Sequence, residues 1–415
     1  MLARLAINGG PPIASDLFKL VPQWPTYGEK EKEALISVLE SRRWCRIYPG
    51  SMAELFESTF AEYHHAKYGI AVANGTVALE LALKTVGVKQ GDKVIVPAVT
   101  FIASASAATE LGAIPVFADV DPETGNISPR SVREIVEREE GVRAVVAVHY
   151  GGNPVNFDEL KPFLNRRGIK LIEDCAHAHG SEWKGRRVGA IGDMGGFSFQ
   201  ESKSLTAGEG GIVLTDNDEY ASKARLIHNI GRVVGRPGYE HYILSSNYRM
   251  TEFQAALLLS KLDEFKEQVE KKHRNGDYLA ERLRRIGGVE PQKMEEGVTK
   301  RGYYYFVFRY DEEEFGGVSK ERFIAALKAE GVPADVGYGM PLYRQKAFSR
   351  EAFLEVMPPG TKYPGYDKMY LPGAEEFTRR EVTLLHHILL GEIEALDLIA
   401  AAIEKIKENA HELVE

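Results

Sequence analysis

The sequence predicts an α/β fold in which a mostly parallel sheet is flanked by helices and followed by a smaller C-terminal α+β domain. Between about residues 31 and 262, short apolar runs alternate with helical patterns. The runs are nearly continuous in their apolar character, which is typical of parallel strands covered on both faces. Strand–helix alternation of this kind favours a doubly wound sheet. Beyond residue 262 the alternation stops.

The predicted elements of the first part follow in chain order. The strands cover 70–73, 93–96, 114–117, 144–148 and 170–172, and the helices between them include 76–86 and 104–111. Two further strands, 196–200 and 211–215, are joined by a polar loop.

The second part begins with a long charged helix, 251–286. An aromatic strand (303–310), a helix (320–330), an irregular Pro/Gly/Tyr-rich region (341–372) and a closing helix (392–408) follow. We therefore predict an N-terminal arm of residues 1–30, a large domain of residues 31–262 and a small domain of residues 263–415. The long helix bridges the two domains in this interpretation.

Composition excludes several classes of function. The chain has 415 residues, a formal net charge of −8 and no basic block, so we expect no nucleic-acid partner. Its two cysteines, Cys45 and Cys175, predict neither a disulfide framework nor a zinc site. No signal peptide and no run long enough to cross a bilayer is visible, so we expect a cytoplasmic protein without a membrane partner.

Asn74-Gly75-Thr76 is the first segment with a possible chemical role. A strand ends here, a glycine turns the chain, and a helix begins with a hydroxyl residue. Helix N-termini present unpaired N–H groups, so phosphate binds there readily. Alternatively, Gly75 is only a turn residue and Thr76 only an N-cap.

An acidic pair, Glu173-Asp174, stands where a buried strand should end. Ligands of open α/β sheets bind at the carboxyl ends of strands, and a buried carboxylate needs a partner. A protonated pyridine nitrogen would be such a partner. A capping or salt-bridged Asp is the alternative.

A single lysine, Lys203, lies in a small-residue loop between the last two strands. A lysine that forms a Schiff base needs such uncrowded surroundings, although a surface lysine in a polar loop is the simpler explanation. The fourth segment, 245–252, precedes the long helix, with Thr251 as its expected N-cap.

Taken together and in this order, the four segments resemble the DegT/StrS family of sugar and cyclitol aminotransferases. These are fold-type I enzymes that depend on pyridoxal 5′-phosphate (PLP). The resemblance implies that Lys203 bonds PLP and moves the proton, and that Asp174 pairs with the ring nitrogen. It also makes residues 31–262 the PLP-binding domain, with pyridoxamine phosphate as the intermediate form of the coenzyme.

Further cofactor contacts are carried over from the family by position. His177 falls near the coenzyme's 3-hydroxyl, and Phe101 matches the residue that stacks on the ring. The phosphate-binding positions match Gly75, Thr76 and Ser198. Asn247 matches an Asn that reaches the phosphate from the neighbouring subunit, which implies a homodimer with shared active sites.

Within the family, the chain is more similar to the branch of glutamine:scyllo-inosose aminotransferases and 3-amino-5-hydroxybenzoate synthases than to the nucleotide-sugar branch. Three segments show this similarity: 336–343, 199–200 and 385–390. The resemblance thus implies a glutamine or glutamate donor and a keto-cyclitol or keto-sugar acceptor. A nucleotide-sugar aminotransferase, a PLP-dependent sugar dehydratase and a non-catalytic PLP-binding regulator are the alternatives. Lys203 counts against the dehydratase, in which His replaces this lysine.

The substrate side is predicted from residue type alone. Candidates whose side chains suit a polyol are Arg43, Trp44, Tyr343, His386 and His387. The tandem histidines follow an apolar run, which we interpret as a strand that places one of the two rings in the substrate pocket. The alternative is one buried, hydrogen-bonded ring and one ring that faces solvent.

Overall fold

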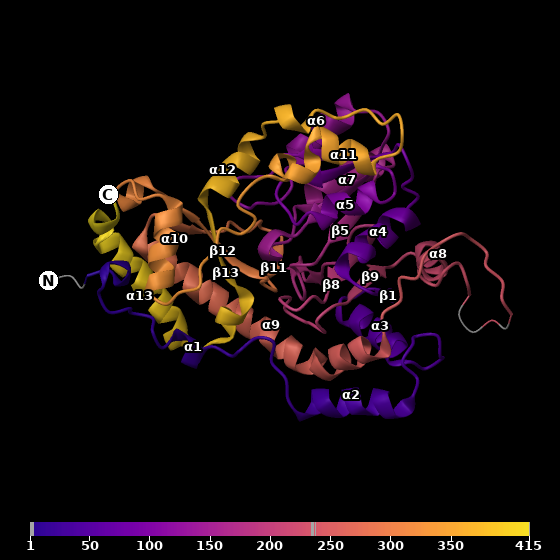
Figure 1. The fold of residues 1–415 in the computed structure, drawn as a ribbon, viewed down its shortest axis with the longest axis horizontal. Helices are drawn as coiled ribbons and strands as arrows, with labels where there is room; N and C mark the ends of the chain where they lie inside the picture. Colours follow the sequence, from indigo (N-terminus) through magenta and orange to yellow (C-terminus); the bar gives the residue numbers. More distant parts are fainter. Residues whose placement is uncertain (1–3, 234–235, 237, 415) are drawn as a thin grey trace.

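The computed structural model describes residues 4–233, 236 and 238–414. A seven-stranded sheet forms its centre, with the strand order β1-β9-β8-β5-β4-β2-β3 (Figure 1). The strands are β1 (Tyr68–Val72), β2 (Lys93–Pro97), β3 (Ile114–Ala118), β4 (Val142–Val148), β5 (Lys170–Asp174), β8 (Met194–Ser198) and β9 (Gly211–Thr215).

The sheet is mostly parallel, as predicted. Neighbouring strands from β3 to β8 pair in parallel, whereas β9 is antiparallel to both β8 and β1. Because parallel strands end at the same edge of a sheet, the loops after β2, β4, β5 and β8 lie together there.

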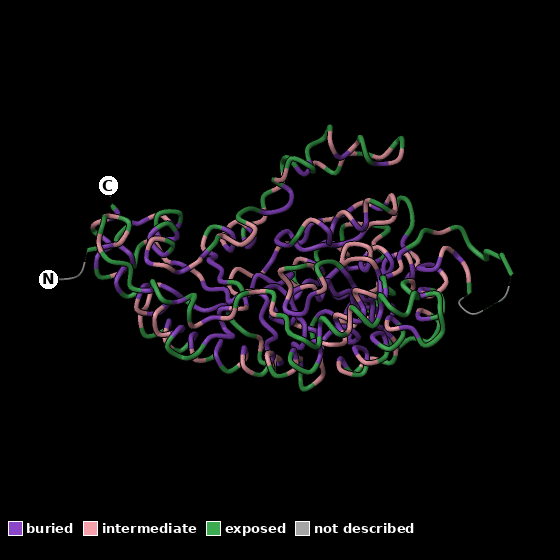
Figure 2. The backbone as a smooth tube through the Cα atoms, turned by 60° about the horizontal axis from the view of Figure 1, so that its bottom comes forward, coloured by how far each residue is buried: buried purple, intermediate pink, exposed green. Residues whose placement is uncertain are grey.

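Helices cover both faces of the sheet. One hydrophobic core packs α4 (Gly75–Thr85), α5 (Ala103–Thr109) and α8 (Asp218–His228) against the sheet. A second core, on α3 (Met52–Tyr63), α6 (Pro129–Arg138), α7 (Phe157–Arg167) and α9 (Glu252–Ile286), packs against the other strand residues. Outside α9 lies α2 (Glu29–Ser41). In Figure 2, many of the buried segments lie in the interior of the molecule.

A third core holds the C-terminal part together. It contains a three-stranded antiparallel sheet of β10 (Val289–Pro291), β12 (Tyr305–Tyr310) and β13 (Glu381–Leu385). Around this sheet pack α10 (Lys320–Ala329), α13 (Ile393–Glu408) and the N-terminal α1 (Leu17–Leu20). Short elements complete the chain: β6 (Glu182–Trp183), β7 (Arg186–Arg187), β11 (Val298–Lys300), α11 (Arg350–Val356) and α12 (Pro372–Arg380).

The long helix α9 begins where the sequence predicts. The Thr251 side chain accepts the Gln254 N–H, and the Gln254 side chain accepts the Thr251 N–H, which forms a capping box. α9 packs against α2 and α3 near its start and against α13 and β10 near its end. The predicted boundary at residue 262 therefore falls inside one continuous helix.

One alternative explanation and one local prediction were wrong. Thr76 is not the N-cap of α4, because the helix already begins at Gly75 and the Asn74 carboxamide oxygen accepts the Val77 N–H at 3.0 Å. His386 and His387 are not on a strand, since β13 ends at Leu385 and residues 386–390 form a 3₁₀ helix.

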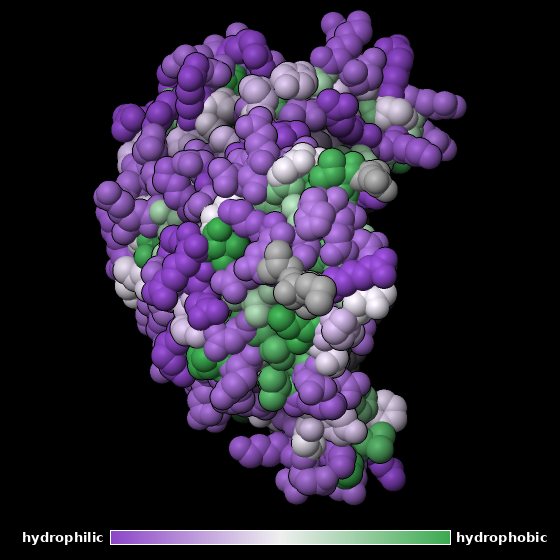
Figure 3. Space-filling view, turned by 90° about the vertical axis from the view of Figure 1, so that its left-hand side faces the viewer, coloured by the Kyte–Doolittle hydropathy of each residue, from purple (hydrophilic) through white to green (hydrophobic). Residues whose placement is uncertain are grey.

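The surface on the side of the chain termini is largely hydrophilic, with small separate hydrophobic areas (Figure 3). No helix among residues 4–233, 236 and 238–414 has the length and apolar character that a membrane span requires.

Candidate active site

A cavity of about 660 Å³ opens at the carboxyl ends of the parallel strands. Its wall combines strand ends, the start of α4 and aromatic side chains of β12 and its approach. Of the residues that the sequence singled out, the cavity brings together Gly75, Thr76, Phe101, Asp174, His177, Ser198 and Lys203. A cavity of this size suits a coenzyme and a small substrate.

The start of α4 lies directly against the end of β8. A Cβ added to Gly75 would stand 2.5 Å from the Cβ of Ser198, so only glycine permits this approach. The first N–H groups of a helix have no partner within the helix, and the helix dipole is positive there. This arrangement fits a phosphate held by Gly75, Thr76 and Ser198.

Asp174 is buried at the end of β5, where its carboxylate forms part of the cavity wall. Its Oδ2 accepts the Ser104 hydroxyl at 2.7 Å, and its Oδ1 accepts the Ala176 N–H at 3.1 Å. Within the described part of the chain, no basic side chain lies within 4.0 Å of this carboxylate. A buried carboxylate with two neutral donors and an open side fits a protonated ring nitrogen as its ionic partner.

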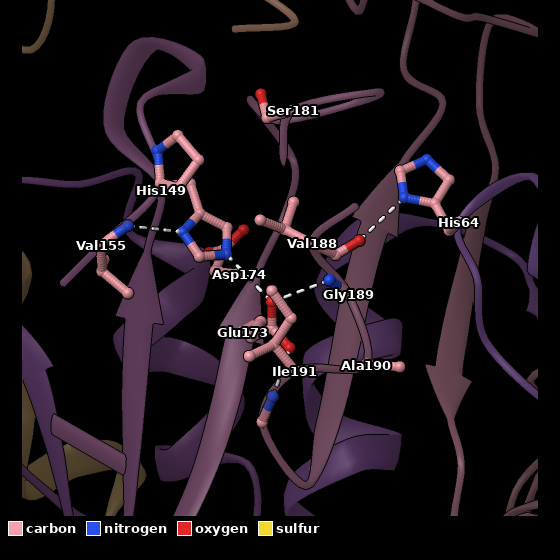
Figure 4. A network of polar contacts seen from close by, with 12 residues as sticks. His64, His149, Val155, Glu173, Asp174, Ser181, Val188, Gly189, Ala190 and Ile191 are labelled. Carbon is pink, nitrogen blue, oxygen red and sulfur yellow. Dashed lines mark hydrogen bonds and ion pairs between the residues drawn. The ribbon is translucent and has the colours of Figure 1, made fainter. Parts of the chain in front are cut away.

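The preceding residue, Glu173, fixes the end of β5 from the other face of the sheet (Figure 4). Its carboxylate accepts the N–H groups of Gly189 at 2.7 Å and Gly192 at 2.6 Å, and it lies 3.2 Å from His149 Nε2. His149 Nδ1 accepts the Val155 N–H at 3.1 Å, so Nε2 carries the proton that it donates to Glu173. These bonds make Glu173 and His149 a structural support for the strand that presents Asp174.

Lys203 follows β8 in the loop to β9, as predicted, and its amine faces the cavity. Its Nζ lies 4.0 Å from the centre of the Tyr304 ring. Burial lowers the pKa of the Lys203 amine, and the nearby Tyr304 and Asp174 oppose only part of this effect. A lysine with a lowered pKa is a better nucleophile and proton acceptor near neutral pH.

His177 lies in the cavity wall between two tyrosines. Its ring stacks on Tyr304 at 4.2 Å, and its Nε2 lies 3.1 Å from the Tyr338 hydroxyl. Its Nδ1 accepts the Gly151 N–H at 3.4 Å. Burial holds the pKa of His177 well below its usual value, so the imidazole is neutral and Nε2–H donates to Tyr338.

Sequence reasoning missed several residues of the site. Ser104 and Thr100, which are joined at 2.9 Å, support Asp174 from the segment after β2. Tyr304, Tyr305 and Tyr338 line the cavity. The aromatic run at 303–305 was the available signal, but its position opposite the strand ends depends on tertiary packing.

Six predicted residues lie outside the cavity wall. Asn247 is exposed on the segment between α8 and α9, and Arg43 and Trp44 are exposed between α2 and α3. Tyr343 was predicted at the substrate and is instead buried in the core, where its hydroxyl donates to Glu375 at 2.5 Å.

His386 and His387 also lie outside the cavity wall. His386 is buried and its Nε2 lies 3.1 Å from the Ser202 carbonyl oxygen, so it supports the Lys203 loop from behind. His387 is partly buried in the 3₁₀ helix.

The chain is similar to aminotransferases along almost its whole length. The model of the DegT/DnrJ/EryC1/StrS aminotransferase family matches residues 25–390. An L-glutamine:scyllo-inosose aminotransferase of Streptomyces griseus is 35% identical over 441 residues, which cover 100% of both chains. A putative L-glutamine:3-amino-2,3-dideoxy-scyllo-inosose aminotransferase of Micromonospora echinospora is 34% identical and covers 99% of this chain and 98% of its own.

Solved structures agree with this result. The crystal structure of 3-amino-5-hydroxybenzoic acid synthase has a TM-score of 0.84 and 34% identity, and the match covers 94% of this chain and 98% of that one. DesI, solved in the presence of its TDP-sugar product, has a TM-score of 0.80 at 28% identity over 99% of both chains. The predicted α/β fold and the resemblance are confirmed. The chain therefore belongs to the DegT/DnrJ/EryC1/StrS aminotransferase family and is an aminotransferase.

Proposed function

We propose that this aminotransferase uses PLP to move an amino group from glutamine or glutamate to the ring ketone of a keto-cyclitol or a related keto-sugar. The observation that carries the proposal is one cavity in which the Lys203 amine, the Asp174 carboxylate and the N-terminus of α4 lie together. A lysine, a buried acid and a phosphate-binding helix start are the three features that this coenzyme needs.

The residues of the cavity fit PLP group by group. Gly75, Thr76 and Ser198 would hold the phosphate, Asp174 the ring nitrogen, and Phe101 one face of the ring. When bound, PLP withdraws electrons from the substrate carbon and carries the amino group from donor to acceptor.

Lys203 and Asp174 perform the proton chemistry in this proposal. Lys203 would bond the coenzyme aldehyde in the resting enzyme and, once displaced, would take the proton from the donor's α-carbon. Its lowered pKa keeps a larger share of the free amine unprotonated for this task. Asp174 would hold the proton on the ring nitrogen throughout, with Ser104 and the Ala176 N–H fixing its orientation.

The proposed acceptor is an uncharged polyhydroxy ring. The similar proteins described above are named as aminotransferases of scyllo-inosose or of a scyllo-inosose derivative. Among the described residues of a single subunit, Lys203 is the only basic side chain of the cavity wall, whereas Gln200, Ser202 and three tyrosines offer hydrogen bonds. Hydroxyl groups suit such a lining better than the phosphates of a nucleotide, which bind best to cations.

We further propose a cytoplasmic homodimer with shared active sites. The segment that carries Asn247 also exposes apolar side chains, including Leu244, which is 99% exposed. Exposed apolar side chains gathered on one segment favour burial against a partner. In this arrangement Asn247, Arg43 and Trp44 of one subunit would face the cavity of the other.

The proposed cytoplasmic location agrees with the state of the cysteines. Both cysteines are free, which suits a reducing compartment.

The test combines coenzyme trapping with a substrate panel. PLP-saturated protein should be coloured, and borohydride reduction should leave the coenzyme mass on the peptide that contains Lys203. With glutamine or glutamate as donor, scyllo-inosose and related keto-cyclitols should be aminated faster than nucleotide-linked keto-sugars. If borohydride treatment leaves no coenzyme mass on the Lys203 peptide, the coenzyme assignment is contradicted. If the nucleotide-linked substrates are aminated faster, the acceptor assignment is contradicted.

A further inference from the structure

The Tyr304 ring is held rigidly at the wall of the cavity. Its hydroxyl lies 2.8 Å from the Ser202 hydroxyl, which in turn donates to the Gln200 side chain at 2.7 Å. Its backbone carbonyl accepts the His386 N–H at 3.0 Å, and the His177 ring stacks on it at 4.2 Å. With both backbone and hydroxyl fixed, the ring has a defined orientation.

The Lys203 amine lies over this ring, with Nζ 4.0 Å from the ring centre. In the described residues, no carboxylate comes within the 4.0 Å that would define an ion pair with Nζ. The face of an aromatic ring carries negative charge density and attracts an ammonium group within about 6 Å of the ring centre. Tyr304 is therefore a direct electrostatic partner of the lysine amine.

We infer that Tyr304 is a positioning residue for Lys203, and that its ring face holds the free ammonium group at the cavity wall whenever the lysine is not bonded to the coenzyme. This inference rests on the proposed function of Lys203. It gives the released lysine one resting place between the two half-reactions. It also favours the charged amine, and so works against the desolvation that burial imposes.

The other titratable groups that line the same cavity must be considered with Tyr304. They are Asp174, whose charge favours the ammonium form, His177, which is neutral, the exposed Glu209, and Tyr305 and Tyr338, whose pKa values are raised by burial. His177 and Tyr305 contact the Tyr304 ring directly, and Tyr304→Phe keeps the ring that they contact. The effect of the ring on the Lys203 amine can therefore be measured by substitution.

The experiment measures the pKa of the Lys203 amine in the full-length protein loaded with pyridoxamine phosphate, in which the lysine is free. Acetylation by acetic anhydride is followed over a range of pH by mass spectrometry of the Lys203 peptide. The exposed Lys89 in the same digest is the internal reference. The variants are Tyr304→Phe, which keeps the ring and loses the bond to Ser202, and Tyr304→Leu and Tyr304→Met, which lose the ring.

Tyr304→Leu and Tyr304→Met should each lower the pKa of Lys203 by about one pH unit, whereas Tyr304→Phe, which loses only the contribution of the hydroxyl, should lower it clearly less. An unchanged or raised pKa in the variants without a ring, or an equal fall in Tyr304→Phe, would overturn the inference. Met serves as the second substitution if Leu impairs folding. Failure of the proposed function is distinguishable, since the parent protein would then carry no borohydride-trapped coenzyme on Lys203.

Discussion

At the scale of single residues, Asp174 allows a direct test of the electrostatics of the site. Asp174→Asn keeps the size of the side chain and one acceptor oxygen for the Ala176 N–H, but removes the charge and the oxygen that accepts the Ser104 hydroxyl. We expect turnover to fall by about 100-fold or more, because the ring nitrogen would lose the partner that keeps it protonated. Ser104→Ala is the matched control: it removes a donor and keeps the charge, so its loss should be much smaller. Equal effects of the two substitutions would contradict the role of the charge.

Lys272 provides a second prediction, on stability. It is buried in α9, and its Nζ donates to the Tyr303 carbonyl at 3.1 Å. In the described part of the chain no carboxylate lies within 4.0 Å of this amine, and burial lowers the pKa of Lys272 from its ordinary 10.5 to about 7. As the pH falls from 10.5 to about 7, Lys272 takes up a proton in the unfolded chain but not in the folded one. The free energy of unfolding therefore decreases over this range.

Lys272→Met should therefore be more stable than the parent, by at least about 1 kcal/mol near neutral pH. The difference in the free energy of unfolding should shrink as the pH rises from about 7 towards 10.5. Urea denaturation at several pH values measures it. The partly exposed neighbour, Lys271→Met, is the control and should show no such pH dependence. A pH-independent difference for Lys272→Met would contradict the explanation.

At the scale of elements, the contact between α4 and β8 positions the N–H groups that we propose to hold the phosphate. Gly75→Ala would place a methyl group 2.5 Å from the Cβ of Ser198, so the helix start must move. We expect the dissociation constant for PLP to rise by about tenfold or more, since the phosphate would lose well-placed N–H donors. Equilibrium titration of the coenzyme measures this. Gly28→Ala, at the remote start of α2 where the added atom meets only ordinary contacts, should bind PLP like the parent.

Elements buried on both faces were the easiest to predict from the sequence. The strands from β2 to β5 show as continuous apolar runs because helices cover them on each side. The histidine pair was misassigned because an apolar sequence does not reveal where a strand stops pairing. β13 stops at Leu385, where β12 begins at Tyr305. The hydrogen bond from Ser104 to Asp174 could not be predicted from the sequence either, because the two residues are 70 positions apart.

At the scale of the whole molecule, long-range packing determines where irregular segments lie, which local sequence patterns do not reveal. The irregular region after Gly339 returns to the large sheet. The Leu342 N–H donates to the Ala98 carbonyl at 2.7 Å, and the Tyr366 hydroxyl donates to the Pro115 carbonyl at 2.5 Å. Tyr343 is therefore part of the core rather than of the substrate pocket. The family motifs singled out the strand-end residues that the cavity brings together, whereas the aromatic run at 303–305 did not reveal that its tyrosines would complete the wall.

The proposed sharing of active sites between subunits makes a further prediction. Lys203→Ala and Asn247→Ala proteins should each be weakly active or inactive, because each dimer lacks one required residue at both sites. In a mixed dimer, the Lys203 of one subunit meets the intact Asn247 of the other at one site. Equal amounts that are unfolded and refolded together should thus recover about a quarter of the parent activity, since half of the dimers are mixed and each has one complete site.

The same two variants refolded separately and then combined are the control, because their subunits have not exchanged. Analytical ultracentrifugation should show a dimer in every preparation. If each site used only the Asn247 of its own chain, no mixed dimer would contain a complete site, and joint refolding would restore no activity. Recovery after joint refolding alone therefore separates a site built by two subunits from one built within a single chain.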